Sequence, residues 1–168
     1  MSRTVVVLLG PTSSIGNLVD PVLRREPRTF YGKLRLLDYL GPVDVLANHN
    51  HDHVVGCVSR VFKLADWPVG NSRTDWWAAE LSLDGADWAK RGTACSIAAW
   101  PLGTESDYGE GVEVIHDAIV HEVSLVAPPH RPAEPFARVL SVRNEEPVSI
   151  AGDGQLLRRG TGTILGVR

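Results

Sequence analysis

The sequence is poor in several features that define whole classes of protein. It has 2 cysteines among 168 residues, Cys57 and Cys95, too few for a disulfide framework, so a reducing cytoplasm is the simplest setting. No apolar run is long enough to span a bilayer, and the run over residues 5–9 is too short for the central region of a signal peptide. The formal net charge is -3, whereas binding to nucleic acid favours a basic face. These absences predict a soluble intracellular protein with no membrane and no nucleic-acid partner.

What is present predicts one globular domain that is mostly β. Hydrophobic residues make up 43% and charged residues 22%, as in ordinary soluble domains. Strand-like segments separated by glycine and proline cover residues 4–9, 29–37, 43–48, 54–64, 76–83, 118–126 and 136–142. Short helices are expected at 13–25 and 84–92, loops at 66–74 and 101–111, and a hairpin at 148–167. The predicted fold class is α+β, mostly β: an antiparallel, barrel-like sheet with a few short helices.

Ser96 lies in a stretch of small and apolar residues that suits a half-buried strand. Its neighbours are Ala94, Cys95, Ile97 and Ala98, which leave a hydroxyl room to meet a substrate. No glycine flanks the serine at the positions that the G-x-S-x-G elbow of the α/β-hydrolases requires. Ser96 is therefore a candidate nucleophile only in combination with partners elsewhere in the chain.

A cluster of histidines is the most unusual composition in the chain. Three of the six histidines, His49, His51 and His53, fall within five residues. On a strand they would share one face and could bind zinc, and the pattern approaches the H-x-H-x-D-H box of the metallo-β-lactamase fold but is one residue short. One of them could instead be a catalytic base, or the segment could be a solvated polar loop. These three interpretations stay open at this point.

Three stretches, taken in order, resemble one known family. His49 precedes Gly56 by seven residues in a strand-like segment, Ser96 follows in W-A-K-R-G-T-A-C-S-I, and H-E-V-S-L-V-A-P-P covers residues 121–129. This ordered set is similar to the bacteriophage prohead (capsid maturation) proteases, the family of the HK97 prohead protease, related in fold to the herpesvirus assemblins. The resemblance covers about residues 30–142 of a single protease domain, 1–168, and leaves 143–168 as a C-terminal hairpin or tail.

The resemblance implies a serine endopeptidase that matures a viral procapsid, with a herpesvirus-protease-like fold. His49 matches the general base, Ser96 the nucleophile that forms an acyl-enzyme, and Glu122 the third catalytic residue, with no metal and no cofactor. The implied substrate is the major capsid protein or a scaffold protein, inside the procapsid in the host cell cytoplasm, and a homo-oligomer is compatible with it. His121 is the alternative third residue, because the herpesvirus branch uses a histidine; strand alternation would let only one of the two face the site.

Two other classes of function stay open. The chain could be an inactive relative that acts as a structural or assembly protein, or a metal-dependent hydrolase that uses His49, His51 and His53. The tryptophans are expected in the core or at contacts between subunits, with an aromatic substrate groove as the alternative; they are Trp67, Trp76, Trp77, Trp88 and Trp100.

Overall fold

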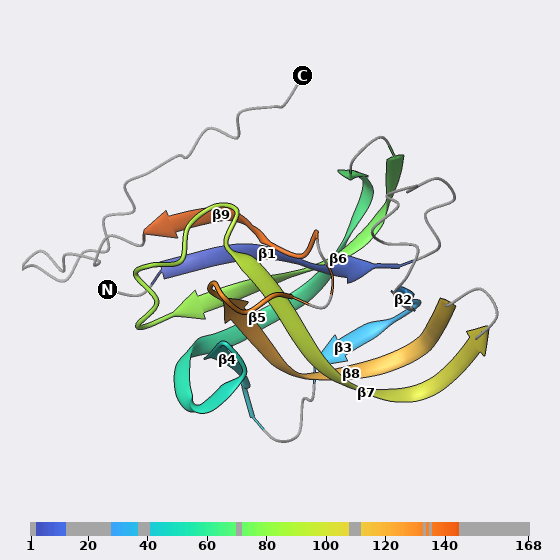
Figure 1. Ribbon diagram of the computed structural model, residues 1–168, viewed down its shortest axis with the longest axis horizontal. Helices are drawn as coiled ribbons and strands as arrows, with labels where there is room; N and C mark the ends of the chain where they lie inside the picture. Colours follow the sequence, from blue (N-terminus) through green and yellow to red (C-terminus); the bar gives the residue numbers. More distant parts are fainter. Residues whose placement is uncertain are drawn as a thin grey trace, which may run out of the picture.

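The computed structural model describes residues 3–12, 28–36, 41–69, 72–107, 112–132, 134 and 136–144. These residues form nine β-strands of one sheet (Figure 1): β1 (Arg3–Pro11), β2 (Arg28–Tyr31), β3 (Leu34–Leu36), β4 (Val43–Ala47), β5 (Asn50–Val69), β6 (Ser72–Leu83), β7 (Ala94–Asp107), β8 (Val112–Val126) and β9 (Val139–Asn144). Strands make up 76% of the described chain and no helix occurs in it. The prediction of a mostly β fold is confirmed, and no short helix is seen among the described residues.

The sheet is mixed, and not antiparallel as the sequence predicted. Its strand order is β2-β8-β4-β5-β6-β1-β9, and β3 and β7 also pair with β8. The pairs that contain β5, β6, β7 or β9 are antiparallel, whereas β2, β3 and β4 each run parallel to β8. Each of these three strands has at most 5 residues, so the 15-residue β8 can accommodate them one after another along one edge. Local sequence patterns show where strands form, but not the direction of their partners.

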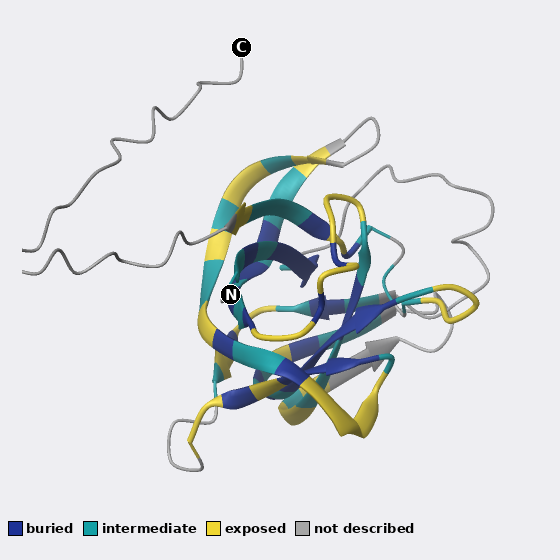
Figure 2. Ribbon diagram, turned by 90° about the vertical axis from the view of Figure 1, so that its left-hand side faces the viewer, coloured by how far each residue is buried: buried dark blue, intermediate teal, exposed yellow. Residues whose placement is uncertain are grey.

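The sheet curls into a half-barrel around the core, and one bridge spans its open side. Ala94, at the start of β7, pairs with Arg138, just before β9; next to this bridge the Cys95 N–H donates to the Ala137 carbonyl at 3.0 Å. Because β9 pairs with β1, this bridge links the two ends of the curled sheet. Figure 2 shows the buried segments on the strands, while the loops and parts of the long strands are exposed. The side chains packed inside include Val5, Val7, Val45, Leu81, Leu83, Val120, Val123, Leu125 and Val139.

The segment before the Ser96 strand forms turns, and the helix predicted over residues 84–92 is wrong. The Ala89 N–H donates to the Ala86 carbonyl at 2.9 Å, which is the i→i+3 bond of a turn. The guanidinium of Arg3 donates to the carbonyls of Ala86 and Ala89, both at 2.9 Å. A helix this short has little stability of its own. Here the Arg3 side chain from β1 binds the carbonyls of Ala86 and Ala89, which a helix would use for its own hydrogen bonds.

The described parts of two predicted loops are strands. Residues 66–69 belong to β5 and residues 72–74 to β6, and β7 continues past Pro101 and Gly103 to Asp107. Register shifts accompany both departures from regular pairing, because a bulge lets a strand continue past a residue that interrupts the hydrogen-bond ladder. The helix expected at 13–25 and the hairpin expected at 148–167 lie outside the described residues.

Gly56 permits the close approach of β5 to β6, and its replacement should destabilise the fold. A Cβ at this position would lie 2.1 Å from the Ser82 carbonyl oxygen, so the backbone would have to move. We expect Gly56→Ala to lower the free energy of unfolding by about 1–3 kcal/mol, measured by chemical denaturation. The control is Gly103→Ala, whose Cβ would meet nothing within 4 Å and should change stability by less than about 0.5 kcal/mol. Equal effects of the two substitutions would contradict this account.

Candidate active site

His49 lies in a tight turn between β4 and β5. Ala47 pairs with Asn50, so only Asn48 and His49 make the connection. Both have positive φ, 54° and 59°, as the two central residues of a type I′ hairpin turn require. Asparagine and histidine adopt this left-handed conformation more often than most side chains do, but both are less favourable in it than glycine. The β4–β5 turn therefore places the imidazole at a position where glycine would be the favoured residue.

Three hydrogen bonds attach the β4–β5 turn to the end of β8. The Asn48 N–H donates to the Leu125 carbonyl at 2.9 Å, and the side-chain oxygen of Asn48 accepts from the Ala127 N–H at 2.7 Å. The His49 N–H donates to the hydroxyl of Ser124 at 3.1 Å. The turn extends the parallel pairing of β4 with β8, and these bonds fix its position over that strand.

The His49 ring is hydrogen-bonded to Glu122 of β8. The distance from Nδ1 to Oε1 of Glu122 is 2.5 Å, and the Glu122 side chain is only 5% exposed. An ionised carboxylate can only accept hydrogen bonds, so Nδ1 is the donor to it, and in the neutral form of the ring Nε2 then carries the lone pair. The Ser124 hydroxyl donates to the same Oε1 at 2.7 Å. The arrangement suits an imidazole that accepts a proton at Nε2 while a carboxylate holds the ring.

Ser96 lies on the same face of the sheet as Glu122 and Ser124. In the β7–β8 pair Ser96 is directly opposite Ser124, and Ala98 is opposite Glu122. Ile97 packs against the core, so alternation turns Ser96 to the other face. Ser96 is buried, and its hydroxyl has no hydrogen bond to any residue that the structure describes. The structure thus brings His49 and Glu122 into contact and places Ser96 on their face, without a hydrogen bond between Ser96 and His49.

A bulge in β8 puts His121 and Glu122 on one face, contrary to the strict alternation expected from the sequence. The pairing shifts between Ala98 and Ala99, whose partners are Glu122 and Val120, so His121 is the extra residue. Val120 and Val123 are both in the core, which leaves the two residues between them on the outer face.

The ring of His121 has a different neighbour from that of His49. It stacks on Trp100 with ring centroids 4.6 Å apart. Among the contacts of the described residues, Glu122 is the one of this adjacent pair that contacts His49. The two residues thus share a face but have separate surroundings.

The other two histidines of the cluster lie on β5 and are exposed. His51 Nε2 is 3.7 Å from Glu122 Oε2, with 79% of its side chain exposed, and His53 is exposed as well. The strand begins after His49, so the three rings do not share one regular strand face. Within the described ranges no group of three or more His, Cys, Asp or Glu side chains has the arrangement of a metal site.

Cys95, the neighbour of Ser96, points into the core. Burial raises the pKa of its thiol to about 12, so the thiol stays protonated near neutral pH. A thiol that is fully buried and protonated does not compete with Ser96 as a nucleophile.

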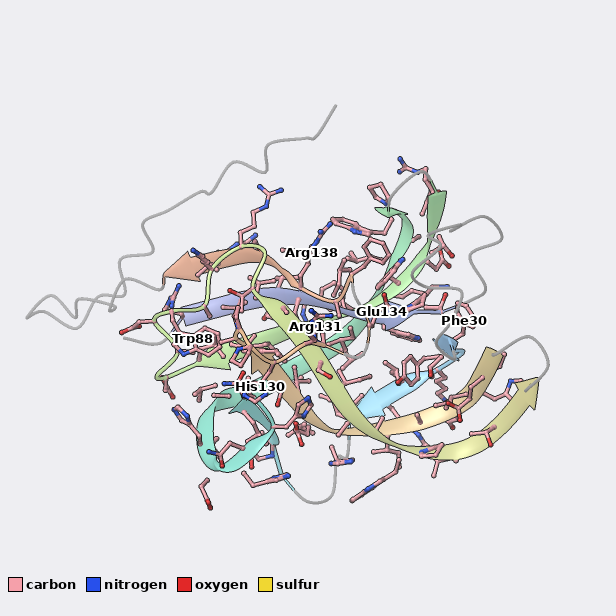
Figure 3. All side chains as sticks on the ribbon, viewed as in Figure 1. Phe30, Trp88, His130, Arg131, Glu134 and Arg138 are labelled. Carbon is pink, nitrogen blue, oxygen red and sulfur yellow. The ribbon has the colours of Figure 1, made fainter. Side chains whose placement is uncertain are left out.

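The segment after β8 joins the β4–β5 turn to the start of β7. Ala127 binds Asn48 at one end of this segment, and Ala137 accepts from Cys95 at the other. Figure 3 labels His130 and Arg131 on this segment. Its two ends therefore lie beside the β4–β5 turn and beside Cys95, the residue before Ser96.

The tryptophans fall into two groups. Trp76 is fully buried, Trp67 is partly buried, and Trp77 is half-buried and donates from Nε1 to the Tyr31 carbonyl at 2.7 Å. Trp88 and Trp100 are 40% and 47% exposed. The prediction of core positions is confirmed for Trp76, and Trp100 lies on the outer face with His121.

Ser124 and Asn48 hold the site together, and neither was predicted as a site residue from the sequence. Ser124 is two residues from Glu122 and therefore on the same strand face, a signal that alternation could have supplied. The role of Asn48 depends on the position of β8 beside the β4–β5 turn, which no local pattern shows.

Comparison of the chain with protein-family models, with curated proteins and with solved structures finds no match. The resemblance to prohead proteases therefore stays a prediction from the sequence. Over the residues that the structure describes, no helix has the length and apolar character needed to cross a membrane.

The strain at His49 can be measured by comparing two substitutions. His49→Ala and His49→Gly both remove the imidazole and its bond to Glu122, but only alanine keeps a Cβ at a φ of 59°. We expect His49→Gly to be more stable than His49→Ala by about 1 kcal/mol in chemical denaturation. Equal stabilities would show that the left-handed conformation costs nothing here.

Proposed function

We propose that the chain is a serine endopeptidase that cleaves a scaffold protein or an extension of the major capsid protein during maturation of a viral procapsid. The observation that carries the proposal is the bond between His49 Nδ1 and the buried carboxylate of Glu122, on the sheet face that also bears Ser96. The ordered resemblance to prohead proteases gives the substrate class. The predicted nucleophile, base and carboxylate come from three different strands or turns, as an assembled catalytic site requires.

The chemistry is acyl transfer in two steps. The Ser96 hydroxyl attacks the scissile carbonyl carbon while His49 Nε2 accepts its proton, and Glu122 stabilises the imidazolium that forms. The C–N bond then breaks, His49 returns the proton to the leaving amine, and an ester remains on Ser96. Water attacks this ester with His49 again as base, which releases the acid and restores the serine. No metal or cofactor takes part.

The edge of β7 offers a place for an extended substrate. One edge pairs with β8 along the length of β7, whereas the other has backbone partners only at Ala94 and Cys95 within the described chain. From Ser96 onward this second edge can accept an extended peptide as an added strand. A scissile bond in such a strand would lie beside the Ser96 hydroxyl.

The proposed setting is the procapsid interior in the host cell cytoplasm, where the substrate is concentrated. The partners are the major capsid protein or a separate scaffold protein, and the enzyme could self-associate as a homo-oligomer. Exposed Trp88 and Trp100 are candidate positions for such contacts.

The experiment that tests this function is replacement of the nucleophile. Ser96 lies among small residues on β7, so Ser96→Ala removes one hydroxyl and should leave the fold intact. We expect the wild-type chain, co-expressed with the major capsid protein of its virus, to shorten that protein, and Ser96→Ala to abolish the shortening. A fluorophosphonate probe should add one label to the wild-type chain, located on Ser96 by peptide mass spectrometry, and none to Ser96→Ala.

Other results would favour the other two classes of function. A folded wild-type chain with an unreactive Ser96 and no processing would point to a structural or assembly protein. Stoichiometric zinc, with cleavage lost on chelation and restored by metal, would point to a hydrolase that uses the histidine cluster. Cleavage that continues undiminished in Ser96→Ala would end the serine-protease proposal.

The assignment of the third catalytic residue predicts different effects at adjacent positions. Glu122→Gln keeps the size of the side chain but removes the charge that stabilises an imidazolium on His49, and we expect turnover to fall by about 10²- to 10³-fold. His121→Ala should lower the thermal midpoint through loss of the stack on Trp100, with little change in turnover. Cleavage rates and thermal midpoints of both variants check this. An active Glu122→Gln together with a folded, inactive His121→Ala would reverse the assignment.

A further inference from the structure

Ser124 forms the link between the β4–β5 turn and the carboxylate of Glu122. Its hydroxyl accepts from the His49 N–H at 3.1 Å and donates to Glu122 Oε1 at 2.7 Å. The His49 ring binds the same Oε1, so backbone, hydroxyl, carboxylate and imidazole close into one hydrogen-bonded ring. Ser124 is fully buried, which removes water as an alternative partner for its hydroxyl.

The direction of each hydrogen bond in this ring is determined by chemistry. A backbone N–H can only donate, so the oxygen of Ser124 is the acceptor from His49. The single hydroxyl proton of Ser124 is then available for Glu122, and the carboxylate oxygen receives one proton from Ser124 and one from the imidazole. An ionised Glu122 can only accept, so with Glu122 ionised these hydrogen bonds have one arrangement.

The hydrogen-bonded ring constrains both the backbone and the side chain of His49. The bond to its backbone holds the strained turn, and the bond to Oε1 fixes the carboxylate that orients its ring. Ser124 also lies directly opposite Ser96, where paired residues have Cβ atoms about 4.5–5.5 Å apart. One buried hydroxyl thus contacts two members of the site and is the cross-strand neighbour of the third.

We propose that Ser124 is a positioning residue that holds His49 and Glu122 in register with Ser96. This inference rests on the proposed serine-protease function and adds a fourth residue to its site. Because the Ser124 proton is committed to Glu122, Ser124 is not a second nucleophile. Its removal should lower the reactivity of Ser96 without changing substrate binding.

The activity test compares Ser124→Ala with Ser124→Thr and a control, Ser141→Ala on β9. We expect Ser124→Ala to slow fluorophosphonate labelling of Ser96 by about 10- to 100-fold, since small misplacements of catalytic groups have effects of this size. Ser124→Thr keeps the hydroxyl and should recover most of the rate, and Ser141→Ala should label like the wild type. With peptide substrate the loss should lie in kcat and not in KM. In a Glu122→Gln background, Ser124→Ala should add less than about twofold, because the group that it positions is already changed.

Two measurements test the ring without any activity. A downfield proton resonance of the His49 Nδ1–H, identified by its loss in Glu122→Gln, should shift or disappear in Ser124→Ala. In the wild-type protein the His49 amide should exchange slowly with solvent, because Ser124 accepts from it. A rapidly exchanging His49 amide would overturn the inference even if Ser124→Ala does not fold.

The two proposals can fail separately. A wild-type chain that is not labelled at Ser96 contradicts the protease function. The Nδ1–H resonance and the amide exchange of His49 still test whether the hydrogen bonds of Ser124 exist. A labelled wild type with an equally reactive, folded Ser124→Ala contradicts only the positioning role. An unchanged downfield resonance in Ser124→Ala would contradict that role as well.

Discussion

The candidate site depends on the attachment of the β4–β5 turn to the end of β8. The turn contributes His49, and β8 contributes Glu122 and Ser124, which are more than 70 positions away in the chain. Three hydrogen bonds made by Asn48 and His49 to residues 124–127 fix the distance between them. Without this attachment a two-residue turn at the sheet rim would place an imidazole in solvent. With it, the imidazole reaches a carboxylate that is almost fully buried.

The pairing of β8 with β4 and β7, together with a bulge in β8, brings the site residues to one edge of the sheet. β4 runs parallel to β8, so the two strands end at the same edge and the turn after β4 meets the residues after Glu122. β7 pairs with β8 from its other side and carries Ser96 opposite Ser124. The bulge at His121 changes which residues face outward just before Glu122, and bulges occur often beside functional sites for this reason. The site is therefore assembled along β8, which pairs with four of the other described strands.

Features that depend on neighbouring residues could be predicted from the sequence, whereas features that depend on contacts between distant segments could not. Strands were predictable where apolar residues alternate, as in β8, because one buried face leaves a local pattern. The continuation of β7 past Pro101 was not, because proline is tolerated only where an edge or bulge spares the hydrogen-bond ladder. Residues 84–92 have the composition of a short helix but form turns, and the carbonyls of Ala86 and Ala89 bind Arg3, a contact that no local pattern shows. His49, Ser96 and Glu122 were selected by motif order, but contact between His49 and Glu122 needed the parallel β4–β8 pairing.

The backbone at His49 gives a separate reason to regard this residue as functional. A two-residue type I′ turn favours glycine, and Asn-Gly is its most common sequence, yet this chain has Asn-His with a φ of 59° at the histidine. A residue held in a sparsely populated conformation costs stability, and such residues cluster at sites where the strain serves a purpose. Glycine would relieve the strain but could not reach Glu122. The preference for an imidazole over an easier turn is explained if the ring is needed for chemistry at the face that carries Ser96.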